Sequence, residues 1–285
     1  MRLGLVTVLL LVTTACADGG TPRPAASPSA APATSATASV TPAPTRSAVP
    51  GAPKVMASMG DSITRAFLDC PQLGDCPPAS WSTGTDADIE SHLARLGGGV
   101  EAHNVAVSGA RVAGLQSQAQ QAVGVKAEYV TILIGANDAC RGSESAMTPV
   151  AEYTAAFDRA MTTLTRGLPD AKILVASIPS LMRLWEVGKD DPKVRGTWDR
   201  FGICQSILAA SADDARRARV NDRVAAYNAA MAASCARHAN CRWDGGAVFE
   251  YEFTLAEVNP IDYWHPSRLG QRARAEVTWT VGFWG

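Results

Sequence analysis

The chain has almost no net charge and few histidines, and both features limit the functions that it can have. Lysine and arginine total 26 against 27 aspartates and glutamates, which leaves a formal net charge of −1. A chain this close to neutral lacks the basic surface that attracts a phosphate backbone, so no nucleic-acid partner is expected. Only four histidines are present, so few side chains can serve as a catalytic base near neutral pH.

The N-terminal apolar run is too short to cross a bilayer, which takes roughly 20 residues. It covers residues 3–12, follows Arg2 and precedes small residues, a pattern typical of an export signal. Val12-Thr13-Thr14-Ala15-Cys16 resembles a lipobox, although Thr13 stands where leucine is preferred, and Cys16 would then carry the lipid. Ala15-Cys16-Ala17 equally fits a plain secretion site. We therefore expect an exported protein, either a cell-envelope lipoprotein anchored at Cys16 or a secreted one.

Large apolar residues are nearly missing from residues 17–52, which consist mostly of Ala, Pro, Ser and Thr. Such a segment buries too little surface to offset the entropy of ordering it, so we expect a disordered linker. The linker would suit a tether, and for that reason we prefer the lipoprotein interpretation. The predicted division is a signal peptide with a lipobox at 1–16, the linker at 17–52 and one folded domain at 53–285.

No cysteine pair has the C-x₂-C spacing of a zinc site, so metal binding is not expected. Six cysteines follow Cys16, an even number that fits disulfides in an exported protein. Short spacing favours Cys70–Cys76 and Cys235–Cys241, and elimination leaves Cys140–Cys204.

The folded part alternates between strand and helix patterns. Short apolar runs predict strands at 54–59, 101–107, 128–134 and 171–178. Helical periodicity covers 150–168 and 212–236, and a last helix is expected to start at Ser267. This alternation predicts a parallel sheet with helices on both faces, a three-layer α/β/α sandwich.

A candidate nucleophile, Ser62, follows the first predicted strand in Gly60-Asp61-Ser62-Ile63-Thr64. A serine hydroxyl attacks an ester only when a base lies within hydrogen-bond reach. Gly-Asp-Ser alone is weak evidence for a nucleophile, because Asp and Ser are also common residues at the N-terminal caps of helices. The G-x-S-x-G elbow of α/β-hydrolases is absent, because Thr64 stands where it needs glycine.

The candidate base is His265, in Asp262-Tyr263-Trp264-His265-Pro266. It alone among the four histidines has a carboxylate three positions before it, Asp262. A carboxylate that accepts from Nδ1–H leaves Nε2 free to take the serine proton. An isolated Asp-x-x-His pair would more often be an ordinary loop contact.

Gly109 and Asn137 are candidate donors for the negative charge that develops on an ester oxygen. Each follows a predicted strand, in Ser108-Gly109-Ala110 and in Gly135-Ala136-Asn137-Asp138. Glycine lets a backbone N–H approach a ligand closely, and the Asn137 amide supplies a donor that aspartate lacks. Taken singly, either residue is more simply a turn residue.

These four segments together resemble the SGNH hydrolase superfamily, also called GDSL esterases, over most of residues 54–284. The resemblance implies a flavodoxin-like α/β/α fold, a triad of Ser62, Asp262 and His265, and an oxyanion hole of Ser62 N–H, Gly109 N–H and the Asn137 amide. Further segments are similar to the phospholipase-B-like branch, although Ala136 stands where that branch has glycine. These are Ser80-Trp81-Ser82-Thr83-Gly84, residues 104–111 and residues 135–140.

The expected activity is hydrolysis of carboxylic esters, of lipids or short acyl chains, through an acyl-enzyme. We expect a monomer with no cofactor, a small-molecule or lipid ester as substrate, and membrane contact only through an anchor at Cys16. A carbohydrate O-deacetylase is an alternative that changes only the substrate. A non-catalytic binding lipoprotein on the same fold is a further alternative, because a fold does not fix a function.

Overall fold

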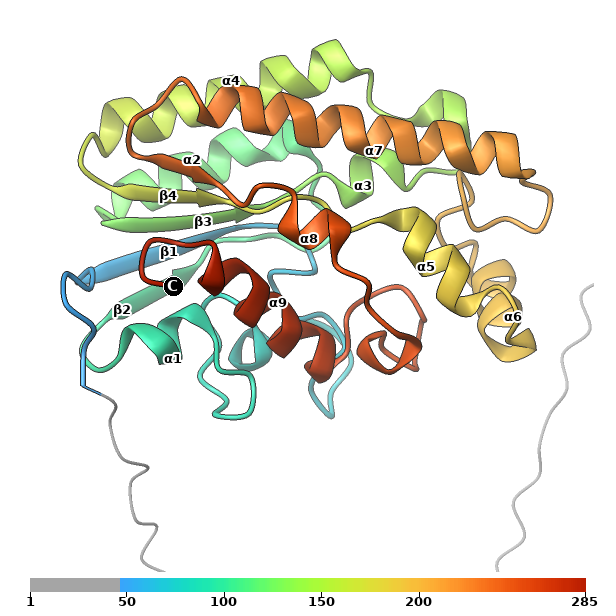
Figure 1. The fold of residues 1–285 in the computed structure, drawn as a ribbon, viewed down its shortest axis with the longest axis horizontal. Coiled ribbons are helices and arrows are strands. Elements are labelled where there is room, and N and C mark those ends of the chain that lie inside the picture. The colour runs from blue at the N-terminus through green and yellow to red at the C-terminus, as the bar shows by residue number, and fades with distance from the viewer. Residues whose placement is uncertain (1–46) are drawn as a thin grey trace, which may run out of the picture. The chain divides into compact units, whose positions relative to one another are not determined.

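A five-stranded sheet organises the computed structural model, which describes residues 47–285 (Figure 1). Its order is β2-β1-β3-β4-β5, and every neighbouring pair is parallel. The strands are β1 (Val55–Gly60), β2 (Glu101–Asn104), β3 (Tyr129–Leu133), β4 (Lys172–Val175) and β5 (Cys241–Trp243). The carboxyl ends of parallel strands meet at one edge, and loops after them can therefore share a site.

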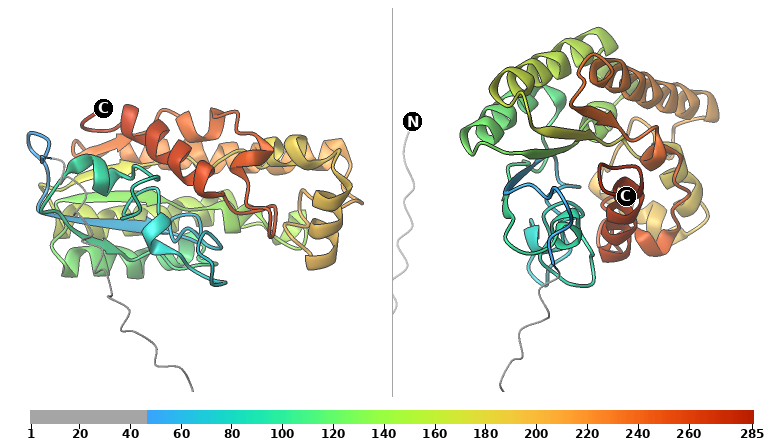
Figure 2. Two further views of the ribbon diagram at one scale, coloured as in Figure 1. Left: turned by 90° about the horizontal axis from the view of Figure 1, so that it is seen from below. Right: turned by 60° about the vertical axis from the view of Figure 1, so that its left-hand side comes forward.

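Helices cover both faces of the sheet. They are α1 (His92–Leu96), α2 (Leu115–Gly124), α3 (Ala136–Ala139), α4 (Val150–Gly167), α5 (Leu181–Gly188), α6 (Pro192–Phe201), α7 (Asp214–Cys235), α8 (Ala247–Glu250) and α9 (Arg268–Thr280). Short 3-10 turns are η1 (Pro77–Ala79), η2 (Val112–Gly114), η3 (Glu144–Ala146) and η4 (Leu255–Glu257). Figures 1 and 2 show α2, α4 and α7 on one face and α1 and α9 on the other. The predicted three-layer α/β/α architecture is confirmed.

The strand predictions agree with β1 and β3 to within one residue at each end, whereas those at 101–107 and 171–178 each extend three residues beyond β2 and β4. The fully buried β3 matches the apolar run at 128–134. Strand β2 ends at Asn104 and not at 107, although Val105 N and Val107 N still donate to Ser58 O and Gly60 O of β1. Strand β5 was not predicted, because its three residues are too few to show a hydrophobic pattern. It joins the sheet by pairing with β4 alone.

Three disulfides join the predicted cysteine pairs, Cys70–Cys76, Cys140–Cys204 and Cys235–Cys241. Cys16 and the predicted signal peptide lie outside the described residues, as does the linker up to residue 46. At the end of the predicted linker, Val49 N donates to Leu96 O of α1. The boundary at residue 53 stays a prediction. Within residues 47–285, no helix is both long and apolar enough to cross a membrane, and no cluster of three or more His, Cys, Asp or Glu side chains is arranged to hold a metal ion.

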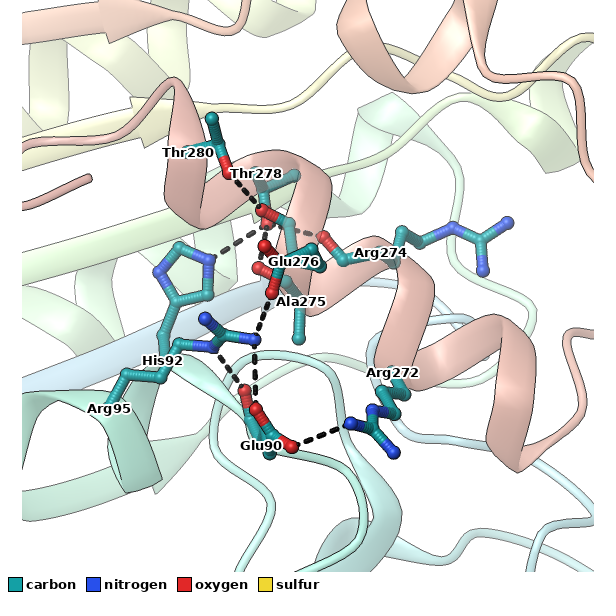
Figure 3. A network of polar contacts seen from close by, with 9 residues as sticks. All are labelled: Glu90, His92, Arg95, Arg272, Arg274, Ala275, Glu276, Thr278 and Thr280. Atoms are coloured by element: carbon teal, nitrogen blue, oxygen red, sulfur yellow. Dashed lines mark hydrogen bonds and ion pairs between the residues drawn. The ribbon is translucent and has the colours of Figure 1, made fainter.

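Buried polar contacts fix α9 against the sheet. His92 lies 2.8 Å from Tyr129 Oη of β3 and 2.8 Å from Thr278 Oγ1 of α9. Burial, with a smaller effect from the Arg95 charge, lowers the pKa of His92 to about 3, so the imidazole is neutral at physiological pH. Figure 3 shows the contact of His92 with Thr278 beside the ion pairs that join Glu90 and Arg95 to α9. The network therefore fixes the helix that begins three residues after His265.

Candidate active site

Ser62 lies in the turn that follows β1, at the carboxyl edge of the sheet. Gly60, which ends the strand, has a φ of 148°, and a Cβ there would lie 2.2 Å from the carbonyl oxygen of Leu133. Only glycine fits this position. Asp61 Oδ1 accepts a hydrogen bond from Ile63 N at 2.9 Å and closes the turn. The turn is thus specified by the residues on both sides of Ser62.

Ser62, His265 and Asp262 form one continuous chain of hydrogen bonds. His265 Nε2 lies 2.8 Å from Ser62 Oγ, and His265 Nδ1 lies 2.5 Å from Asp262 Oδ2. The other oxygen of Asp262 accepts the backbone N–H groups of Trp264 at 2.9 Å and His265 at 3.1 Å. The structure therefore brings Ser62 next to His265, which lies 203 positions later in the sequence, and next to the Asp262 that His265 contacts. This is the geometry in which a carboxylate orients an imidazole and the imidazole activates a serine.

The Asp262 carboxylate is held in its charged form. Burial by itself opposes ionisation of Asp262. The hydrogen bond and the charge of His265, together with the two backbone donors, outweigh that effect, and the pKa of Asp262 lies below its ordinary value. A charged carboxylate in this position is able to accept from Nδ1–H and to stabilise a protonated imidazole.

The loop that holds His265 is fixed by backbone contacts. Tyr263 has a φ of 54°, in the left-handed region that costs a non-glycine residue about 1 kcal/mol or more. Trp198 Nε1 donates to Tyr263 O at 2.8 Å, and Asn259 N donates to His265 O at 2.8 Å. The Phe67 ring packs on the His265 ring with their centroids 4.9 Å apart. These contacts stabilise the strained turn and set the direction of the imidazole.

Asn137 and the Gly109 turn lie beside each other. Asn137, the second residue of α3, donates from Nδ2 to Ala110 O at 3.0 Å. A carboxamide nitrogen has two N–H donors, so this bond leaves one of them for another acceptor. Gly109 is exposed with a φ of 79°, and no atom lies within 4 Å of the position a Cβ would take. The open space beside it leaves room for a ligand to approach the backbone.

Two backbone donors at this edge have no acceptor within residues 47–285. Neither Ser62 N nor Gly109 N donates a hydrogen bond to any residue that the structure describes. Unpaired N–H groups beside a serine hydroxyl suit the stabilisation of a developing oxyanion. The predicted site residues therefore lie after strands at one edge of the sheet, and Ser62 N and Gly109 N are both free to donate to a ligand there.

Asp138 connects α3 to its neighbours, a role that no sequence motif predicts. Its Oδ2 accepts from Val112 N at 2.9 Å and its Oδ1 from Thr148 Oγ1 at 2.7 Å. Burial raises the pKa of Asp138 above its ordinary value, and these hydrogen bonds partly oppose the rise. The only feature of the sequence that points to Asp138 is its position next to Asn137. Its two hydrogen-bond partners, Val112 and Thr148, come from other segments of the chain.

Asp61 is a further buried carboxyl group of the site. Its Oδ2 atom is buried and has no hydrogen-bond partner among the described residues. Burial raises the pKa of Asp61 to about 7, and the bond from Ile63 N and the charges of His265 and Arg274 oppose a larger rise. A carboxyl group next to the serine is therefore neutral or ionised depending on pH within the physiological range.

A cavity lies next to the hydrogen-bonded residues Ser62, His265 and Asp262, and sequence neighbours of Ser62 and His265 form part of its wall. It encloses about 620 Å³ of empty space, part of it open to solvent. Ile63, Ala136, Trp264 and Pro266 form part of its wall, and each is adjacent in sequence to a predicted site residue. The rest comes from α5, the segment from α8 to η4 and α9, and most of these side chains are apolar, with Glu257 and Arg274 as the charged ones. The cavity is suited to hold an apolar portion of a substrate.

Comparisons with known proteins agree with this geometry. A family model described as "GDSL-like Lipase/Acylhydrolase family" matches residues 58–273. The human protein "Phospholipase B1, membrane-associated" is 29% identical over 167 residues, which cover 47% of this chain and 12% of that protein. The chain thus matches only a small part of that relative's length.

Solved structures show the same fold. The extracellular lipase of Streptomyces rimosus has a TM-score of 0.51 at 20% identity and covers 80% of this chain and 99% of its own. The acetylxylan esterase Axe2 of Geobacillus stearothermophilus, solved as a catalytic mutant, has a TM-score of 0.50 at 18% identity, with 80% and 94% covered. At such identities the likeness extends to the fold alone.

Proposed function

The chain belongs to the GDSL-like Lipase/Acylhydrolase family, and we propose that it cleaves carboxylic esters through an acyl-enzyme formed on Ser62. In the first half-reaction, Ser62 Oγ attacks the ester carbonyl carbon while His265 Nε2 takes the hydroxyl proton. The tetrahedral intermediate then collapses, and the leaving alkoxide receives that proton as it departs. Asp262 holds the imidazole with Nε2 towards the serine throughout.

The second half-reaction regenerates the enzyme. A water molecule attacks the acyl carbonyl carbon and passes its proton to His265 Nε2. The carbon–oxygen bond to Ser62 breaks, the proton returns to Ser62 Oγ, and the carboxylic acid leaves. In both steps Ser62 N–H, Gly109 N–H and the free Asn137 N–H are the proposed donors to the oxyanion.

One observation carries this proposal, namely the hydrogen-bond chain that joins Ser62 to His265 and His265 to Asp262. Hydrolysis of p-nitrophenyl butyrate by the wild-type protein and its loss in Ser62→Ala would support it. Ser108→Ala is a matched control, because Ser108 is a second serine at the same edge and its hydroxyl donates to Asp75. Equal activity of the wild type and Ser62→Ala would reject the proposal and favour a binding protein on this fold.

The substrate proposed is a lipid or short-chain acyl ester. The cavity beside the site is lined mainly by apolar side chains, including Leu181, Leu184 and Val248, and this lining suits an acyl group longer than acetyl. A series of p-nitrophenyl esters from acetate to octanoate checks this. Activity that rises beyond acetate agrees with the proposal, whereas activity on acetate alone would identify a carbohydrate O-deacetylase as the better account.

Anchoring to the cell envelope through a lipid on Cys16 is part of the proposal. The three disulfides fit a protein that folds outside the cytoplasm. A lipidated protein would partition into detergent, and Cys16→Ser would abolish this partitioning. Mass spectrometry that found an unmodified mature chain beginning at Asp18 would instead establish plain secretion.

A further inference from the structure

Arg274 is a positive charge that lines the cavity without an ion-pair partner. It lies on α9, and its Nη1 donates to Gly270 O at 3.0 Å. The Nε atom is buried and has no hydrogen-bond partner within residues 47–285. A guanidinium has five N–H donors, so most of them remain for a ligand.

Other arginines on α9 behave differently. Arg268 pairs with Asp86 and Asp88, and Arg272 pairs with Glu90. Figure 3 shows the Arg274 side chain leaving the helix away from His92 and Arg95, while Arg272 points to Glu90. Arg274 therefore does not belong to the ion-pair network that holds α9 in place.

The acidic residue of the cavity wall, Glu257, is engaged elsewhere. Its Oε1 accepts from the Tyr251 hydroxyl at 2.6 Å. Its Oε2 accepts from Thr254 N at 2.8 Å and from Thr254 Oγ1 at 3.1 Å, which closes a capping box. Glu257 makes no salt bridge to Arg274 among the described residues, so the guanidinium has no carboxylate partner of its own.

Burial of this charge is costly, and a bound anion would reduce the cost. Burial lowers the pKa of Arg274 to about 10, and the charges of Glu257 and Asp61 partly oppose this shift. The Arg274 charge in turn lowers the pKa of Asp61, the residue that precedes Ser62. A charge-assisted, bidentate contact with a carboxylate or phosphate is the pairing that best fits a guanidinium.

On the premise that the esterase activity proposed above is correct, we infer that Arg274 binds an oxyanion carried by the substrate. The preferred substrates are esters in which a carboxylate or phosphate is separated from the reacting ester carbonyl by a short apolar spacer. The apolar wall of the cavity takes the spacer, and Arg274 takes the charge. Arg274 thus acts in substrate selection, whereas Ser62 and His265 carry out the chemistry.

The test compares two esters of similar length, monomethyl glutarate and methyl butyrate, by titrating the acid released at pH 8. A charged hydrogen-bonded contact favours the anionic ester, and we expect kcat/KM to be about tenfold or more higher for monomethyl glutarate. In Arg274→Gln the ratio falls to about one, and in Arg274→Lys it is partly kept. Arg272→Gln, the matched control on the same helix, keeps the wild-type ratio. A wild-type ratio of one or less, or an unchanged ratio in Arg274→Gln, would overturn the inference.

Inhibition by product-like anions identifies which oxyanion is bound and does not depend on a variant that folds. Glutarate and propyl phosphate are compared with butyramide, which carries no charge, as competitive inhibitors of methyl butyrate hydrolysis by the wild type. Stronger inhibition by glutarate indicates a carboxylate, and stronger inhibition by propyl phosphate indicates a phosphate. If neither exceeds butyramide, the inference is wrong.

Failure of the proposed function would look different. If the wild type hydrolysed neither ester, the esterase proposal would fail, and calorimetric binding of glutarate and propyl phosphate would still test the anion site. Binding that Arg274→Gln abolishes and Arg272→Gln leaves intact would uphold the Arg274 site without the esterase. No binding of either anion to the wild type would overturn it.

Discussion

The side chain of Gln118 on α2 makes two hydrogen bonds with the backbone of Gly60, the residue that ends β1. Its Oε1 accepts from Gly60 N at 2.7 Å, and its Nε2 donates to Gly60 O at 2.9 Å. Both groups are buried, and the turn that carries Ser62 begins at the next residue. The position of Ser62 therefore depends on a helix that contributes nothing to the hydrogen-bond chain itself.

Gln118→Ala should destabilise the protein, because it leaves two buried backbone groups without this partner. The expected loss is about 2–4 kcal/mol in the free energy of unfolding, measured with urea. Gln121→Ala is the control, since Gln121 lies on the same helix but is exposed and makes only a 3.4 Å contact to Ser117 O. It should change stability by about 0.5 kcal/mol or less. Equal effects of the two variants would contradict this account of the turn.

Asn137→Ala should lower kcat by about 10²–10³ and change KM little, because it removes a donor that acts mainly on the developing oxyanion. Initial rates on an ester of the preferred chain length give both constants. The bond to Ala110 O is also lost, so urea unfolding of the variant must be measured beside the rates. A fall in kcat of less than about threefold, in a folded variant, would remove Asn137 from the oxyanion hole.

Asp61 should make the protein less stable as pH rises. Burial raises its pKa from 3.8 to about 7, so in that range the folded state keeps a proton that the unfolded chain releases. The contribution of Asp61 to the free energy of unfolding is therefore largest below pH 3.8, the pKa in the unfolded chain. It is lost as the pH rises to about 7, the pKa in the folded protein, and the loss is at most about 4 kcal/mol.

Asp61→Asn stays neutral and keeps an oxygen that can accept from Ile63 N. Its free energy of unfolding should therefore rise relative to the wild type between pH 5 and pH 8, measured with urea at both values. A difference between the two proteins that does not depend on pH would show that Asp61 does not titrate in this range.

The long disulfide should stabilise the fold more than a short one. Cys140 and Cys204 lie 64 positions apart, and Cys235 and Cys241 lie 6 apart. In the chain-entropy model these separations correspond to about 4 and about 2 kcal/mol. Unfolding of the two double serine variants, Cys140→Ser/Cys204→Ser and Cys235→Ser/Cys241→Ser, measures both values. A larger loss from the short disulfide would contradict the model for this protein.

The sequence predicts best where local chemistry decides the structure. The run at 128–134 is apolar and β-branched, and it forms the buried central strand β3. Ser267 caps α9 by accepting from Gly270 N, as the predicted helix start requires. The glycine at position 60 and the Asp-x-x-His spacing of Asp262 and His265 likewise express constraints that act over a few residues.

Features that depend on distant segments could not be predicted from the sequence. Gln118 and Arg274 belong to no motif, and their roles arise only when α2 approaches Gly60 and α9 approaches the cavity. Strand β5 exists because it pairs with β4, and three residues cannot indicate that by themselves. The hydrogen bonds of Asp138 could not be predicted either, because its partners Val112 and Thr148 come from other segments of the chain.

The central claim is that Ser62 and His265 act as one catalytic unit. The most direct test is kcat for hydrolysis of ethyl butyrate, an alkyl ester whose leaving group needs a proton, in Ser62→Ala, His265→Ala and the double variant. Each single change should reduce kcat to a similarly low level, with the double variant little worse, because either change already disables the unit. Near-wild-type activity of His265→Ala, or losses that multiply in the double variant, would contradict the claim.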